Sequence, residues 1–79
     1  MPDQNKTILL VVNKVQVSGG VTGELSAGLS CRGFHAIILR VVRNEDIPVE
    51  LFDLSALTPA DMGAIKGIVL EFTGRTLDA

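Results

Sequence analysis

The segment from Pro48 to Phe72 constrains the fold of this chain more than any other stretch. It opens with a short apolar run, Val49-Glu50-Leu51-Phe52, that predicts a buried strand ending at Asp53. The next signal is Thr58-Pro59-Ala60-Asp61, which combines an N-cap residue, a proline at the first helical position and an acid three residues after the cap. This combination predicts that a helix begins at Thr58. A strand that leads directly into a helix is a unit of layered α/β architectures.

The predicted helix has a clear buried face and a clear end. Its apolar side chains recur at spacings of three and four residues, and they are Met62, Ile65, Ile68, Val69 and Phe72. Gly74 suits the residue after the helix, because glycine readily adopts the left-handed conformation found there. Free backbone N–H groups and the helix dipole converge where a strand end meets a helix start. We therefore expect the working surface to lie between Asp53 and Ile65.

The beginning of the chain indicates at least one more strand. Thr7–Val12 is a continuous run of β-branched residues and leucines, typical of a central strand buried on both faces. Lys14–Val17 alternates polar and apolar residues, like a half-exposed or edge strand. One long strand and a tight hairpin through Asn13-Lys14 both fit. Residues 1–6 are polar and are expected to be disordered.

The segment from Ser26 to Asn44 matches two templates. As a helix it has one continuous apolar stripe, and its opposite face collects the basic residues Arg32, His35, Arg40 and Arg43. As a strand, Ala36–Val42 is a β-branched run, but Arg40 would then share a face with two apolar residues. The helix template matches more positions, so we predict a helix, with residues 35–42 as its ambiguous part.

These segments predict a single domain, residues 1–79, of the α/β class, in the form of an α+β sandwich. We expect a small sheet with two helices packed on it, in the approximate order β-β-α-β-α. The chain is 47% hydrophobic, which is high for a domain that buries only about 60% of its unfolded surface. We therefore expect an exposed apolar patch and self-association into a homo-oligomer.

Charge and composition argue against several kinds of partner. A net charge of −2, with three Phe as the only aromatic residues, does not suit nucleic acid, which requires a basic surface and stacking rings. No apolar run approaches the roughly 18 residues of a membrane span, and the start lacks a signal-peptide pattern. We therefore expect a cytoplasmic protein. Cys31 is the one cysteine, which excludes an intrachain disulfide and is typical of a small core residue.

No complete catalytic set is visible, so we expect no enzyme, no cofactor and no metal site. Asp53 and Asp61 fit a turn and a helix cap better than a cation site or an acid–base pair. His35 has no evident activating partner, and a solvated face explains it better than phosphoryl transfer. The glycine-rich segment Val17–Gly23 lacks the lysine and the spacing of phosphate-binding loops and predicts a plain loop.

The stretch Asp53-Leu54-Ser55-Ala56-Leu57, with Asp61 and the apolar stripe after it, resembles the strand–turn–helix of STAS domains, the anti-sigma factor antagonist type. Gly23-Glu24-Leu25 lies about where that family carries a similar motif at a strand end. The resemblance covers roughly residues 15–75 and implies a regulatory module that binds a protein partner at the helix start. The partner-binding residues would be Asp53, Ser55, Thr58, Asp61, Met62, Gly63 and Ile65. Met62 stands where regulated members have a phosphorylatable residue, so a phosphoswitch is not implied there.

A second resemblance is to the histidine phosphocarrier (HPr) of sugar transport. It rests on Arg32-Gly33-Phe34, on Leu51–Leu54 and on Glu71–Gly74, and it implies a strand over Ala36–Val42. The active histidine of that family is not matched at residues 13–22, so this fold would lack the transfer chemistry. We expect a non-catalytic protein-interaction module, with a self-assembling structural protein as the alternative. A functional basic face would meet an acidic protein partner.

Overall fold

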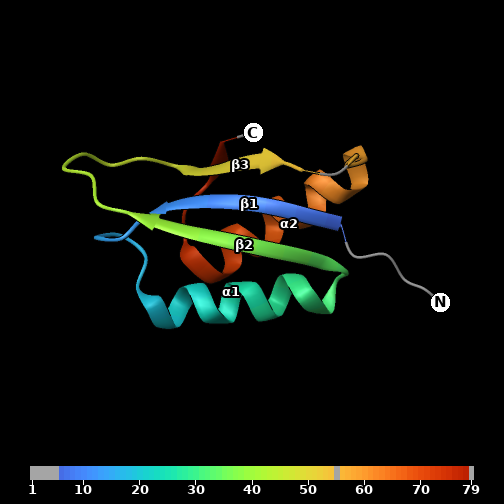
Figure 1. The fold of residues 1–79 in the computed structure, drawn as a ribbon, viewed down its shortest axis with the longest axis horizontal. Helices are drawn as coiled ribbons and strands as arrows, with labels where there is room; N and C mark the ends of the chain where they lie inside the picture. The colour runs from blue at the N-terminus through green and yellow to red at the C-terminus, as the bar shows by residue number, and fades with distance from the viewer. Residues whose placement is uncertain (1–5, 55, 79) are drawn as a thin grey trace.

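The structure, a computed structural model, describes residues 6–54 and 56–78. Figure 1 shows two helices packed against one small sheet, which confirms the predicted fold class. The elements in chain order are β1 (Lys6–Asn13), α1 (Gly19–Cys31), β2 (Phe34–Val41), β3 (Val49–Asp53), α2 (Pro59–Thr73) and β4 (Leu77–Asp78). Of the segment expected to be disordered, residues 1–5 lie outside the described residues. Lys6 already belongs to β1, and its N–H donates to the carbonyl of Gly33 at 3.1 Å.

The sheet has the order β2-β1-β3-β4. β1 is parallel to β2 and antiparallel to β3, and β3 is parallel to β4. The chain therefore consists of two strand–helix–strand units, related by an approximate two-fold axis normal to the sheet. Crossovers between parallel strands are almost always right-handed, so this symmetry places α1 and α2 on the same face of the sheet. No described helix covers the opposite face.

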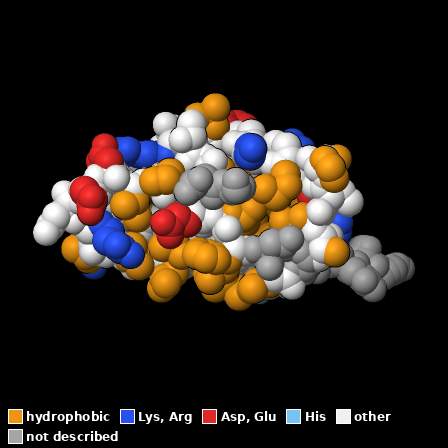
Figure 2. Space-filling view, turned by 90° about the horizontal axis from the view of Figure 1, so that it is seen from above, with side chains coloured by type: hydrophobic (Ala, Val, Ile, Leu, Met, Phe, Trp, Pro, Cys, Tyr) orange, Lys and Arg blue, Asp and Glu red, His pale blue; other side chains and the backbone are white. Residues whose placement is uncertain are grey.

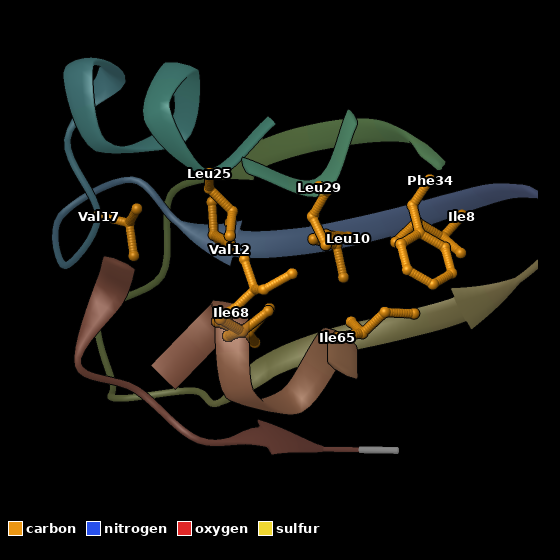
Figure 3. Close-up of a cluster of buried hydrophobic side chains, with 11 residues drawn as sticks. Ile8, Leu10, Val12, Val17, Leu25, Leu29, Phe34, Ile65 and Ile68 are labelled. Carbon is orange, nitrogen blue, oxygen red and sulfur yellow. The ribbon is translucent and has the colours of Figure 1, made fainter. Parts of the chain in front are cut away.

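The core lies between the sheet and the two helices (Figure 3). Leu25 and Leu29 of α1 and Ile65 and Ile68 of α2 converge there on the central strand β1. The β1 side chains that point into the core are fully buried, at 0% exposure, and they are Ile8, Leu10 and Val12. Burial of each such side chain is worth about 1.5–3 kcal/mol, so β1 holds both helices in place.

Helix α2 begins and ends where the sequence predicts. The Thr58 hydroxyl accepts a hydrogen bond from the backbone N–H of Asp61 at 3.1 Å, and the Asp61 carboxylate accepts one from the N–H of Thr58 at 2.9 Å. These two bonds form a complete capping box. At the other end Gly74 has a φ of 71°, and its N–H donates to the carbonyl of Leu70, which terminates the helix.

The predicted helix over residues 26–44 is confirmed through Cys31 and is wrong after it. Helix α1 ends at Cys31, Gly33 adopts a φ of 89°, and Phe34–Val41 forms β2, which pairs with β1 along its whole length. Glycine at residue 33 permits the reversal because it adopts positive φ without steric cost. Both faces of β2 are largely apolar, so a strand reproduces the apolar stripe of a helix. The strand that the HPr resemblance implies is present through Val41.

The region before α1 also differs from the prediction. Lys14–Val17 is a turn rather than a strand, since the N–H groups of Gln16 and Val17 both donate to the carbonyl of Asn13 at 2.9 Å. The glycine-rich segment is not a plain loop, because Ser18 caps α1 by accepting the N–H of Val21 at 3.2 Å. At the other end of this helix Cys31 is exposed, not a core residue.

Gly28 is expected to be required where α1 passes α2. A methyl group there would lie 2.7 Å from Cε2 of Phe72, whereas Gly23 in the same helix has open space at the equivalent point. We expect Gly23→Ala to stabilise the fold by about 0.5–1 kcal/mol through helix propensity. Gly28→Ala should be at least about 1 kcal/mol less stable than Gly23→Ala because of overpacking. Equal free energies of unfolding in urea for the two variants would contradict this contact.

Candidate functional site

The helix-free side of the sheet presents a continuous apolar surface, which we term the open face. Because side chains alternate along a strand, the β1 residues that do not enter the core point to this side. Strand pairing aligns them with their neighbours in two rows, Phe52–Leu9–Ile37 and Glu50–Val11–Leu39. The apolar members of these rows define the open face, and they are Leu9, Val11, Ile37, Leu39 and Phe52.

Three side chains of the open face extend well into solvent, with Ile37 at 47%, Leu39 at 51% and Phe52 at 49% exposure. Val11 is only 7% exposed, although it lies outside the helix-side core, because its row neighbours flank it. Figure 2 shows hydrophobic side chains gathered along the lower side of the view, with a cluster of charged side chains at the left end and single charged groups elsewhere. A contiguous exposed apolar surface marks a site of interaction. The apolar patch expected from composition is therefore present on the sheet.

The site predicted at the start of α2 is only partly assembled. Of the predicted residues, Thr58 and Gly63 are exposed, and Asp61 and Met62 are half-buried. Ile65 is 0% exposed and belongs to the core, so its side chain does not reach a partner. Asp53 is the last residue of β3, but its side chain and the whole of Ser55 lie outside the described residues.

Asp61 is engaged within the fold. Its Oδ2 lies 2.5 Å from Nζ of Lys6 and also accepts the N–H of Thr58. These hydrogen bonds, first that from Lys6 and then that from Thr58, hold the pKa of Asp61 below its ordinary value of 3.8. The ion pair joins the start of β1 to the first turn of α2, so Asp61 has a structural role.

The predicted basic face of Arg32, His35, Arg40 and Arg43 is wrong as a single surface, because most of the segment is not helical. Arg32 is the C-cap of α1. His35 and Arg40 lie on β2 at positions of opposite parity and so point to opposite faces of the sheet. Arg40 is on the helix side, where its Nε donates to the carbonyl of Val17 at 3.3 Å. Arg43 lies in the loop after β2.

Asn13 joins two loops at the end of β1. It is 2% exposed. Its Oδ1 accepts the backbone N–H of Val15 at 3.2 Å and that of Arg43 at 3.3 Å, and its Nδ2 donates to the carbonyl of Glu45 at 3.0 Å. In the sequence, the one sign of this role is that Asn13 is a polar residue directly after the apolar run Ile8–Val12. Asn13 therefore fixes the β1–α1 turn against the β2–β3 loop.

Two surface grooves adjoin these loops. One, of about 440 Å³, is lined by Asn13, Val15, Gln16 and residues 42–46. The other, of about 350 Å³, lies between residues 46–48 and 74–76 and contains an ion pair in which the Arg75 guanidinium is 3.9 Å from Oδ2 of Asp46. Within residues 6–54 and 56–78, no three His, Cys, Asp or Glu side chains are close enough to hold a metal ion.

The chain matches no protein-family model, no curated protein and no solved structure. Among the described helices none is both long and apolar enough to cross a membrane. Gly23-Glu24-Leu25, the second motif of the STAS resemblance, lies inside α1 rather than at a strand end. The resemblance and the regulatory role that it implies stay predictions.

Asn13→Ala is expected to destabilise the fold by about 2–3 kcal/mol. The substitution removes the acceptor of two part-buried backbone N–H groups, those of Val15 and Arg43, and the donor to the carbonyl of Glu45. Each such hydrogen bond contributes about 0.5–1.5 kcal/mol. Asn44→Ala, at an exposed position of the neighbouring loop, should change the free energy of unfolding by less than about 0.5 kcal/mol. Chemical denaturation measures both, and a small effect of Asn13→Ala would show that it does not organise the loops.

The Lys6–Asp61 ion pair is expected to stabilise the fold in a pH-dependent manner. A carboxyl with a lowered pKa in the folded chain stabilises it above the unfolded pKa, and this stabilisation is lost as pH falls through the folded pKa. Asp61→Asn should therefore be less stable than the unchanged chain at pH 7, and the difference should shrink below about pH 4. Asp46→Asn is the control, since that side chain is 86% exposed and its ionic partner Arg75 is 3.9 Å away. Asparagine keeps the Oδ1 that accepts a hydrogen bond from the Gln16 side chain. A stability difference for Asp61→Asn that is constant with pH would refute the assignment.

Proposed function

We propose that this chain is a non-catalytic, cytoplasmic protein-interaction module that contacts a protein partner through the open face. The observation that carries the proposal is the half exposure of Ile37, Leu39 and Phe52 on a sheet face that no described helix covers. Burial of apolar surface stabilises association by about 25 cal/mol per Å². Contact with a protein removes this surface from water.

The shape of the open face favours a macromolecular partner over a small ligand. Small-molecule sites are concave and enclose most of the ligand, whereas the open face is the surface of a sheet. Its backbone is fixed, since β1 and β2 are paired along eight residues. A prearranged surface loses little conformational freedom on binding, so more of the burial energy remains as affinity.

The start of α2 is the alternative contact surface, as the STAS resemblance implies. Thr58 and Gly63 are exposed there, and a partner could pack against the open space beside Gly63. Asp61 already pairs with Lys6 and the core holds Ile65, so this surface offers less free apolar area. The open face is therefore the favoured site.

A photoreactive phenylalanine analogue at residue 52 tests the proposal. The matched control is the same analogue at Leu70, which is 52% exposed on α2, away from the open face. In the organism that produces the protein, illumination should cross-link residue 52 to a defined protein with a yield at least about tenfold above that at residue 70. A bound partner excludes water from the centre of the contact surface, so the excited group there reacts with the partner rather than with water. Equal adduct yields at the two positions would show that the open face is not a contact surface.

A further inference from the structure

We propose that the partner of the open face is a second copy of this chain, packed sheet against sheet with the four helices on the outside. This inference rests on the proposed function, since it uses the same surface. The two open faces would then form a second core in the middle of the dimer. Sheets that pack face to face in this way lie about 10 Å apart with interdigitating side chains.

The area of the open face fits a small dimer. With strands about 4.8 Å apart and about 3.3 Å per residue, the eight residues of β1 and β2 and the five of β3 span a flat area of about 350 Å². The ridged side-chain surface is larger than this flat area, so two copies bury on the order of 1,000 Å² in total. That is the lower limit for a specific protein interface. The dimer is therefore expected to form reversibly at micromolar concentrations.

The arrangement of side chains is complementary to itself. Phe52, Leu9 and Ile37 lie in one row, with the aromatic ring on β3 and the isoleucine on β2. A two-fold axis along β1 brings Phe52 of each copy opposite Ile37 of the other, with the two Leu9 side chains between them. Such an isologous contact is the commonest arrangement in symmetric oligomers.

Charge does not oppose this contact. The whole chain carries a net charge of −2, but the one acid among the described side chains of the two rows is Glu50. It lies on β3, to one side of the proposed axis, so the Glu50 side chains of the two copies occupy opposite flanks. Two copies can therefore approach without bringing like charges together, and a partner of opposite charge has little to recognise.

Sedimentation equilibrium of the full chain tests the proposal. Between about 5 and 500 µM, a range that spans micromolar dissociation constants, the average mass should rise from near 8.4 kDa towards twice that value. Leu39→Glu should raise the dissociation constant at least about tenfold, because the proposed axis places residue 39 opposite Glu50 of the other copy and so brings two like charges together in an apolar contact. Leu70→Glu is the matched control, since the two leucines are 51% and 52% exposed, and it should dimerise like the unchanged chain.

A cross-linking experiment tests the geometry and does not depend on the folding of Leu39→Glu. In a Cys31→Ser background, Phe52→Cys and Ile37→Cys chains are mixed and treated with a bismaleimide that spans the roughly 10 Å between facing sheets. The mixed cross-link should exceed either homodimeric cross-link several-fold. A strictly monomeric chain, a dimer unaffected by Leu39→Glu in its folded form, or an absence of preferential mixed cross-linking would each overturn the proposal. A monomer whose residue 52 still links to a different protein would leave the proposed function intact and refute only self-association.

Discussion

The alternation of side chains along β1 is the constraint on which the rest of the structure depends. Ile8, Leu10 and Val12 point to one side and hold both helices, while Leu9 and Val11 point to the other. Because the two strand–helix–strand units are related by an axis normal to the sheet, both helices lie on one face. A sheet of this topology therefore buries one face within the chain and leaves the other without a helix over it.

Local signals in the sequence were sufficient for β3 and α2, whereas the short strand β4 was not predicted. Thr58, Asp61 and Gly74 determine the ends of α2 through hydrogen bonds to residues three or four positions away. The local sequence is therefore enough to predict both ends of this helix. The middle was ambiguous for a physical reason. A strand with two apolar faces produces the same pattern as an amphipathic helix, and only its pairing with β1, which is non-local, distinguishes the two. The fold class, a small sheet with two helices packed on it, was nevertheless predictable from the composition and the lengths of the segments.

The sequence predicted that the domain exposes an apolar surface, but it did not predict where on the fold this surface lies. The excess of apolar residues predicted exposed apolar surface, and the structure locates it on β2 and β3, chiefly at Ile37, Leu39 and Phe52. Sequence reasoning placed the site at the start of α2 instead, because strand-to-helix turns are common binding positions. Lys6, distant in sequence, engages Asp61 there. Likewise Asn13 gains its role from a loop about 30 residues away, which no local pattern reveals.

Methyl relaxation by a soluble paramagnetic probe tests the central claim most directly, namely that the open face is covered in the working protein. Leu39 and Leu70 have nearly equal exposure in the isolated chain, 51% and 52%, so their methyl groups should relax equally if nothing covers either. The account predicts that, in concentrated solution, the probe enhances the relaxation rate of the Leu39 methyl groups several-fold less than that of the Leu70 methyl groups. This difference should disappear on dilution. Equal relaxation of the two leucines at every concentration would contradict it.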